Sequence, residues 1–439
     1  GLKSRINAKP PETNSDYRSI NTDYSVPVIS HEIGQWCVFP NFDERHKYTG
    51  HLKAKNFDIF ADELAAIGQG SQAREFLLAS GKLQTLCYKE EIESALRTPG
   101  YAGFQLLGLS DFTGQGTALV GMLDPFWEPK PYVSAREIAR FCGPVVPLAR
   151  LKQRTFTTAE SLRAELELAN FGPRELKPAQ LRWKVVVAGT QQVLASGELS
   201  SQVARGELRE VGPISVPLAS APAPRKLQLI VGLADSDIEN DWDLWVYPIE
   251  PLAAESDARA RNTLVTSRWD DEARQQLANG GQVLLTLPPS SVKTDQVLGF
   301  SPLFWNTTWT MGQEPHTLGI LCQPKHPLLR NFPTESHCNW QWWELINGAA
   351  AMDLTEVCPT VQPLIQVVPD WAHPRLLALA FEAQVDAGNV LVTSANVLSD
   401  QQRRPAARQF LASLHAYLAS DSFQPQATLS PDQVQMLIK

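Results

Sequence analysis

The hydrophobic pattern changes its period twice along the chain, and this change constrains the fold more than any other feature. Short apolar segments alternate with helix-like segments up to about residue 147, strict apolar–polar alternation follows to about residue 250, and the first pattern then returns. Alternating strands and helices predict a parallel sheet, whereas period-two segments punctuated by Gly and Pro predict an all-β sandwich. We therefore expect a multidomain protein with an α/β part on each side of a β-sandwich.

The first part, residues 1–147, contains two expected strands. Pro27–Glu32 is an apolar segment that predicts a buried strand, and Tyr101–Leu109 predicts the second. Helical spacing is present over Phe57–Ile67, Gln72–Ala79 and Lys89–Thr98. A strand that is followed by helices and then by a second strand is typical of a unit in which the two strands are parallel.

The second and third parts follow in the same way. Residues 148–250 contain alternating segments such as Ser161–Leu168, and their size and spacing predict an immunoglobulin-like β-sandwich. After an acidic, Ala-rich linker, residues 262–439 predict an α/β layer domain, flavodoxin-like or amidotransferase-like. This domain lacks a Gly-x-Cys-x-Gly nucleophile turn, since Pro324 follows Cys322 closely, and we expect it to be non-catalytic.

Composition excludes several classes of function. The formal net charge of -8 provides no positive field for nucleic acid. The longest apolar runs fall far short of the roughly 20 residues of a membrane-spanning helix. The six cysteines contain no C-x-x-C pair, which argues against a zinc ribbon and favours scattered buried thiols. A Cys322–Cys338 or Cys338–Cys358 disulfide is the alternative in an oxidising compartment.

The segment Pro27-Val-Ile-Ser-His-Glu-Ile-Gly34 carries the strongest chemical signal. Glu32 is expected at the C-terminal end of a strand, followed by a small Gly, where barrel enzymes place their reacting groups. Gln35 and Trp36 come next, and Trp36 could form an apolar wall that faces a sugar. Glycoside hydrolysis uses a pair of carboxyl groups, of which Glu32 would be one.

This segment resembles the nucleophile strand of glycoside hydrolase family 2, with Glu32 at the nucleophile position. Tyr101–Leu109 is similar to the eighth barrel strand of that family, and the loop after it contains Asp111, Gly114 and Trp127. The resemblance implies the C-terminal half of a (β/α)8 barrel followed by an immunoglobulin-like domain. It also implies a retaining exo-β-glycosidase of polysaccharide degradation that acts by double displacement on a carbohydrate, without a cofactor, in the periplasm or outside the cell.

The sequence departs from the family in two respects. Ile33 stands where the family usually has an aromatic residue, so the sugar pocket is expected to differ. The family's acid/base Glu follows an Asn on the fourth barrel strand, and no Asn-Glu pair on a strand precedes Pro27. We therefore expect an associated N-terminal segment of the same enzyme to supply it, and the sequence leaves a homo-oligomer open.

Four further residues complete the candidate site together with Trp36 and Glu32, and no metal is expected. His31 could orient Glu32 or bind a sugar, and Gln35 adjoins the motif; Asp111 follows the second strand, where it could bind a sugar hydroxyl. Arg5 belongs to a polar segment before the nucleophile strand, as a substrate-facing loop would. Structural roles for His31 and Asp111, and a solvated loop around Arg5, are the alternatives.

Two other functions remain open at this point. A carbohydrate-binding or scaffolding fragment without catalysis would account for the absent acid/base group and for Trp340, Trp342 and Trp343 near the C-terminus. An esterase or amidotransferase in the last domain would lack the usual nucleophile turn around its Ser residues. His326, His337 and Cys338 fit no usual zinc spacing.

Overall fold

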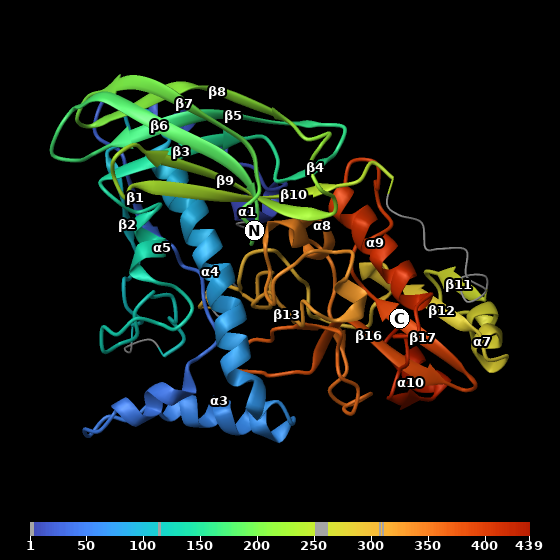
Figure 1. The fold of residues 1–439 in the computed structure, drawn as a ribbon. Coiled ribbons are helices and arrows are strands. Elements are labelled where there is room, and N and C mark those ends of the chain that lie inside the picture. Colours follow the sequence, from blue (N-terminus) through green and yellow to red (C-terminus); the bar gives the residue numbers. More distant parts are fainter. Residues whose placement is uncertain (1–3, 113–115, 251–261, 307–308, 310) are drawn as a thin grey trace.

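The computed structural model describes residues 4–112, 116–250, 262–306, 309 and 311–439. Gly114 and linker residues 251–261 therefore lie outside the described part of the chain. The protein is multidomain and built mainly of β-sheet, with helices in its first and last parts (Figure 1). Among the described residues, no helix combines the length and the apolar character needed to cross a membrane.

The first part contains a parallel pair of strands joined through helices. Its strands are β1 (Ile29–Ile33) and β2 (Gly103–Leu106), and its helices are α1 (Arg5–Ala8), α2 (Arg18–Asn21), α3 (Lys55–Ala66), α4 (Ala73–Leu96) and α5 (Ala135–Ala139), with short 3-10 turns at Phe42–Lys47 and Gly70–Gln72. The two strands are adjacent and parallel, as the order of one strand, helices and a second strand predicts.

Helix α4 differs from its prediction, since one helix of 24 residues replaces the two expected over Gln72–Ala79 and Lys89–Thr98. Gly81 in the middle suggests a break, but this glycine allows a close contact instead. A Cβ atom at Gly81 would lie 2.1 Å from Cδ1 of the buried Tyr132. The helix is buried on several sides because it packs against the rest of the first part on one side and against the third part on the other (Figure 1).

Strand β1 also differs from its prediction, because it is largely exposed rather than buried. Only Ile33 is buried in it, and Ile29 is 53% exposed. The sheet of β1 and β2 has two strands among the described residues, so each strand has one unpaired edge and the apolar side chains of β1 are incompletely covered.

The second part is a sandwich of two sheets. A three-stranded sheet has the order β3-β5-β8, and a five-stranded sheet has the order β4-β10-β9-β6-β7. Its strands are β3 (Val145–Leu151), β4 (Thr155–Thr157), β5 (Ser161–Asn170), β6 (Leu176–Val187), β7 (Val193–Val203), β8 (Glu207–Pro217), β9 (Arg225–Leu233) and β10 (Glu239–Tyr247). Alternate residues of β5 such as Leu162 and Leu166 fill the core between the sheets, as their period of two predicts.

The third part contains a mixed eight-stranded sheet. Strands β11 (Thr263–Thr266), β12 (Gln282–Thr286) and β17 (Gly388–Thr393) are parallel neighbours, as the α/β prediction requires. The remaining strands are β16 (Leu377–Val385), β15 (Ile365–Val367), β13 (Ile320–Cys322), β14 (Met352–Asp353) and β18 (Thr428–Leu429). The pairs β17–β16, β16–β15, β15–β13 and β16–β14 are antiparallel, and β18 is parallel to β16. The sheet is therefore not the wholly parallel sheet of a flavodoxin-like fold.

The helices of the third part are α7 (Asp271–Ala278), α8 (Trp343–Ile346), α9 (Pro405–Leu418) and α10 (Pro431–Met436), with 3-10 turns at Pro289–Ser291, Pro327–Leu329 and Trp340–Trp342. Trp340 and Trp342 are buried, and the Trp342 indole donates to Thr334 Oγ1 at 2.8 Å. They therefore form no exposed carbohydrate platform. All six cysteines are free thiols, so neither alternative disulfide is present.

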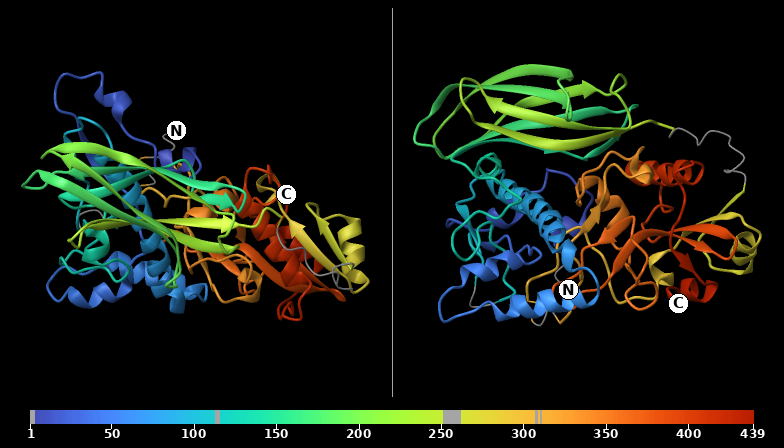
Figure 2. Two further views of the ribbon diagram at one scale, coloured as in Figure 1. Left: turned by 45° about the horizontal axis from the view of Figure 1, so that its top comes forward. Right: turned by 60° about the horizontal axis from the view of Figure 1, so that its bottom comes forward.

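The sandwich lies against both other parts (Figure 2). Glu93 on α4 is fully buried and accepts hydrogen bonds from Asn240 Nδ2 at 2.8 Å and from the Trp242 indole at 3.0 Å, both on β10. Thr155 of β4 donates to Glu344 of α8 at 2.8 Å. Buried polar contacts of this kind require partners in fixed positions, so they hold the three parts in one arrangement.

Candidate functional site

Glu32 lies in a β-bulge of strand β1. Ser30 pairs with Phe104 and Ile33 with Leu106, so three steps along β1 correspond to two along β2. Glu32 has a φ of 54°, a left-handed conformation that is strained for a residue other than glycine. Bulges redirect side chains, and strained conformations of this kind cluster at functional sites.

Glu32 lines a cavity of about 480 Å³, which we call the strand-end cavity. Its walls come from the N-terminal segment, from β1 and the turn after it, from α4, and from residues 301–304 and 313–315 of the third part. The lining residues are Ser4, Asn7, Tyr17, Ser30, Glu32, Ile33, Gly34, Gln35, Trp36, Glu91, Ser301, Pro302, Phe304, Gln313, Glu314 and Pro315.

The charged residues that line the strand-end cavity are all acidic. Three carboxyl groups line it, those of Glu32, Glu91 and Glu314, and its described lining contains no Lys, Arg or His. Aromatic side chains and amides make up much of the remaining wall. Such a cavity disfavours an anionic ligand and suits a neutral, hydroxyl-rich one, or one that develops positive charge during a reaction.

Two side chains hold the turn that follows Glu32. Gln35 donates to the Glu32 carbonyl oxygen at 3.1 Å and accepts from the Trp305 indole at 3.0 Å. The Trp36 indole donates to Glu91 Oε2 at 2.8 Å, and the Gly34 amide donates to the same oxygen at 2.9 Å. Glu91 thus fixes both the turn and the orientation of Trp36.

Burial raises the pKa of Glu91, and the hydrogen bonds from Trp36 and Gly34 oppose this effect only in part. The folded state binds this proton more tightly than the unfolded chain. The contribution of Glu91 to the free energy of unfolding therefore falls as the pH rises from the usual pKa of 4.5 through the raised pKa.

Variants of Glu91 test its positioning role. Glu91→Gln keeps an acceptor for both donors and removes the titrating group. At neutral pH its urea unfolding midpoint should therefore equal or exceed that of the wild type. The part of the pH dependence of stability that comes from Glu91 should be absent from this variant. Glu91→Ala leaves two donors without an acceptor and should lower the free energy of unfolding by about 2 kcal/mol. Glu63→Gln, on the exposed face of α3, is the control. Equal midpoints for Glu91→Ala and the wild type would contradict the assignment.

The third part of the chain is tied to the cavity by paired hydrogen bonds. Asn7 Nδ2 donates to Ser301 Oγ at 2.8 Å, and the Ser301 amide donates to Asn7 Oδ1 at 3.0 Å. Trp36 also forms a backbone bridge with Phe304. Residues 301–304 are therefore held as a wall of the cavity by Asn7 and Trp36, which lie far earlier in the chain.

The structure brings some of the sequence-derived candidates together and separates others. Glu32, Gln35 and Trp36 line the strand-end cavity. His31 is exposed beside it, with Nδ1 3.0 Å from Gln105 Oε1 and Nε2 3.6 Å from Glu32 Oε1.

Asp111 and Arg5 lie outside the cavity lining. Asp111 is buried, 2.7 Å from Lys130 Nζ, and accepts from the Gly121 amide at 2.8 Å. Arg5 pairs with Glu90 at 3.1 Å and donates to Ser94 at 2.8 Å. Both are held in internal contacts of the first part.

Several lining residues were not identified from the sequence. Glu91 belongs to the run Lys89-Glu-Glu-Ile-Glu93, which is typical of a solvated helix face, and only tertiary contacts distinguish it. Phe304 and Glu314 lie in a domain that the sequence assigned no role in the site. Among the described residues, no group of three or more His, Cys, Asp and Glu side chains could hold a metal ion.

Two segments of the chain match models of protein families without an assigned function. Residues 160–248 match the model of Domain of unknown function (DUF8488), and residues 264–439 match that of Domain of unknown function (DUF8487). No curated protein matches the chain.

Solved structures match only in part. The sporulation control protein Spo0M from Bacillus subtilis matches 24% of this chain and 50% of its own, with 11% identity and a TM-score of 0.19. A β-glucosidase from Listeria innocua in complex with gluconolactone matches 24% of this chain and 16% of its own, with 12% identity and a TM-score of 0.19. A β-glucuronidase from glycoside hydrolase family 2 matches 22% and 10%, with 13% identity and a TM-score of 0.17. Glycosidases are thus among the structural neighbours, but such TM-scores do not establish a shared fold.

Proposed function

We propose that the chain carries the nucleophile of a retaining exo-β-glycosidase and that this nucleophile is Glu32. The observation that carries the proposal is the position of Glu32, which lies in a strained bulge at the end of a parallel strand and lines an acidic cavity. The resemblance of the strand to glycoside hydrolase family 2 supports the same role.

In this reaction, the Glu32 carboxylate attacks the anomeric carbon and forms a glycosyl ester while the aglycone oxygen departs with a proton from the acid/base residue. Water then attacks the ester after giving its proton to the same residue, and the sugar leaves with its configuration retained. The transition states carry positive charge on the sugar ring, which the additional carboxyl groups of Glu91 and Glu314 would stabilise.

The acidic lining favours neutral sugars as substrates. A uronic acid would bring a negative charge into a cavity with three carboxyl groups and no described cation. Trp36, Tyr17 and Phe304 offer apolar surface to the sugar ring, and Asn7 and Gln35 offer amides to its hydroxyls. Neutral β-glycosides are therefore the proposed substrate class.

The acid/base residue is proposed to lie on a segment that pairs with the sheet of β1 and β2. Each of these strands has an unpaired edge among the described residues, and Val26 and Ile29 are 63% and 53% exposed nearby. Open edges and exposed apolar residues beside them are normally covered by further strands. An associated segment of the same enzyme would complete the barrel in this way.

Covalent trapping tests the proposal directly. The protein is incubated with 2-deoxy-2-fluoro-β-glycosyl fluorides of neutral sugars, which form the ester quickly and hydrolyse slowly. Mass spectrometry should show one added glycosyl group, and peptide mapping should place it on Glu32. Label on another residue, or no label in a preparation that hydrolyses β-glycosides, would overturn the assignment.

A further inference from the structure

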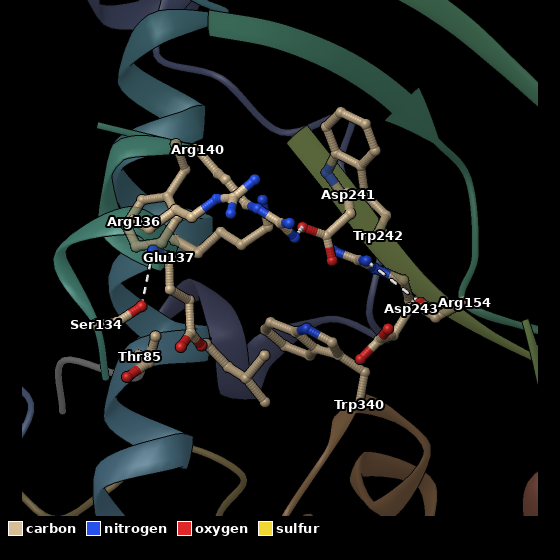
Figure 3. A pocket seen from close by; sticks show the side chains of 13 residues that line it. Thr85, Ser134, Arg136, Glu137, Arg140, Arg154, Asp241, Trp242, Asp243 and Trp340 are labelled. Atoms are coloured by element: carbon tan, nitrogen blue, oxygen red, sulfur yellow. Dashed lines mark hydrogen bonds and ion pairs between the residues drawn. The ribbon is translucent and has the colours of Figure 1, made fainter. Parts of the chain in front are cut away.

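A second pocket of about 340 Å³, which we call the junction pocket, lies where the three parts of the chain meet. Its walls are formed by α4, by the segment around α5, by β10 of the sandwich and by Trp340 of the third part (Figure 3). It shares no lining residue with the strand-end cavity, and the proposed function does not use it.

The decisive group in the junction pocket is the guanidinium of Arg154. Arg154 is only 4% exposed, and its Nε has no hydrogen-bond partner within the described residues. Nη1 donates to the Asp243 carbonyl oxygen at 3.4 Å, and Nη2 lies 3.9 Å from Glu90 Oε2, beyond hydrogen-bond distance. The guanidinium carbon lies 5.4 Å from the centre of the Trp340 ring.

Another buried arginine in the same region shows what a structural role requires. Arg97 is fully buried and donates to the Ser15 carbonyl at 2.8 Å, to Glu90 at 2.6 Å and to Ser94 at 3.0 Å. A buried cation is normally compensated in this way. Arg154 is compensated less closely, since its ion pair with Glu90 is 3.9 Å long and its Nε has no hydrogen-bond partner within the described residues, so the guanidinium can take a further acceptor.

A second arginine, without an ion-pair partner among the described residues, lies at the same pocket. The side chain of Arg136 on α5 is exposed and forms no hydrogen bond or ion pair with the described residues. By contrast, Arg140 is neutralised by Asp241 and Glu239, each at 2.6 Å. Figure 3 shows Arg136 and Arg140 on one side of the pocket and Arg154 on the other, with the Trp340 indole below them.

The remaining polar lining contains the carboxylates of Glu137, Asp241 and Asp243 together with Thr85, Ser134 and Lys89, whose ammonium already pairs with Glu93. Asp241 accepts from Gln228 at 2.7 Å besides Arg140, and Asp243 lies 2.7 Å from Lys226. A carboxylate offers about four acceptor positions, so both groups can accept further hydrogen bonds. The pocket therefore combines free donors for an anion with acceptors for hydroxyl groups.

We propose that the junction pocket binds a hydroxylated carboxylate, of the chemical class of uronic or aldonic acids. The ligand carboxylate pairs with the guanidinium of Arg154, and Arg136 adds charge at the rim. The ligand hydroxyls donate to Asp241 and Asp243. Because the walls come from all three parts of the chain, binding stabilises their arrangement and raises the melting temperature with ligand concentration.

Calorimetric titration of the intact protein with glucuronate tests this proposal, with glucose and inorganic phosphate as the other probes. Glucuronate should bind, and glucose and phosphate should each bind at least about tenfold more weakly, since one lacks the charge and the other the hydroxyl donors. No binding of glucuronate would overturn the proposal. Equal binding of phosphate would replace it with a simple anion site, and equal binding of glucose would remove the role of the carboxylate.

Three variants locate the site. Arg154→Met should weaken glucuronate binding about tenfold or more, and Arg136→Gln should weaken it by a smaller factor. Arg154 also borders a larger cavity, of about 830 Å³, whose wall contains Arg408, so Arg408→Gln should leave the affinity unchanged. Loss of binding in Arg408→Gln with none in Arg136→Gln would overturn the assignment to the junction pocket.

The melting temperature without ligand separates a binding role from a structural one. Replacing an under-compensated buried cation with an apolar side chain of similar shape should leave the melting temperature of Arg154→Met unchanged or raised. The glucuronate-dependent increase should disappear in this variant. A strongly lowered melting temperature without ligand would make Arg154 a structural residue and overturn the proposal.

Discussion

Glu32→Gln should lower kcat for neutral aryl β-glycosides by about four orders of magnitude or more, because glutamine cannot form the glycosyl ester. The substitution keeps the size of the side chain. Glu32 is also half-exposed, with 49% of its side chain accessible, so the melting temperature should change little. The measurement is steady-state hydrolysis of a panel of nitrophenyl glycosides by the complete enzyme, with Glu63→Gln as the control on an exposed helix face.

A truncated variant separates a nucleophile from an acid/base residue. Glu32→Ala leaves a space that azide can enter, and azide should restore turnover and give the α-glycosyl azide, since it attacks from the face that Glu32 used. Rescue that gives the β-glycosyl azide would make Glu32 the acid/base residue instead. Turnover of Glu32→Gln within tenfold of the wild type would remove Glu32 from the mechanism.

The substrate panel also tests the charge of the cavity. With three carboxyl groups and no described cation in the lining, β-glucosides or β-galactosides should be hydrolysed with higher kcat/KM than β-glucuronides. The opposite order would require a cation from a segment outside the described residues.

The strands of the sandwich were predictable because their determinants are local. A period of two over Ser161–Leu168 places alternate residues on one face whatever the strand pairs with, and β5 has these apolar residues in the core. Helix α4 was less predictable, because Gly81 has the local properties of a helix break. Gly81 is instead required by the ring of Tyr132, 51 positions further along the chain, which packs where a Cβ atom would lie.

Only the part of the candidate site that lies on strand β1 and the turn after it could be predicted from the sequence. The sequence placed Glu32 at the end of β1, but the bulge around it depends on register with β2, about 75 residues away. The wall formed by residues 301–304 depends on hydrogen bonds between Asn7 and Ser301, and no local pattern encodes such a contact. The sites that sequence analysis missed are therefore the ones made by tertiary contacts.

Gly34→Ala should lower the free energy of unfolding by about 3 kcal/mol or more, through two separable effects. Gly34 has a φ of 79°, which an L-residue adopts at a cost, and a Cβ atom there would lie 1.9 Å from Cε1 of Tyr88. The Tyr88 ring is fully buried, and its hydroxyl donates to the Val120 carbonyl at 2.7 Å. The ring therefore cannot move away, and the turn after Glu32 must shift instead.

Gly68→Ala is the matched control, since Gly68 has a φ of 78° and no atom within 4 Å of the added Cβ. It should lose only the conformational part, about 1 kcal/mol. Urea unfolding of both variants isolates the contribution of the contact with Tyr88, and activity should fall in Gly34→Ala alone because its shifted turn displaces Glu32 and Trp36. Equal losses of stability in the two variants would show that Tyr88 does not hold the turn, and the geometry of the strand-end cavity would then need another cause.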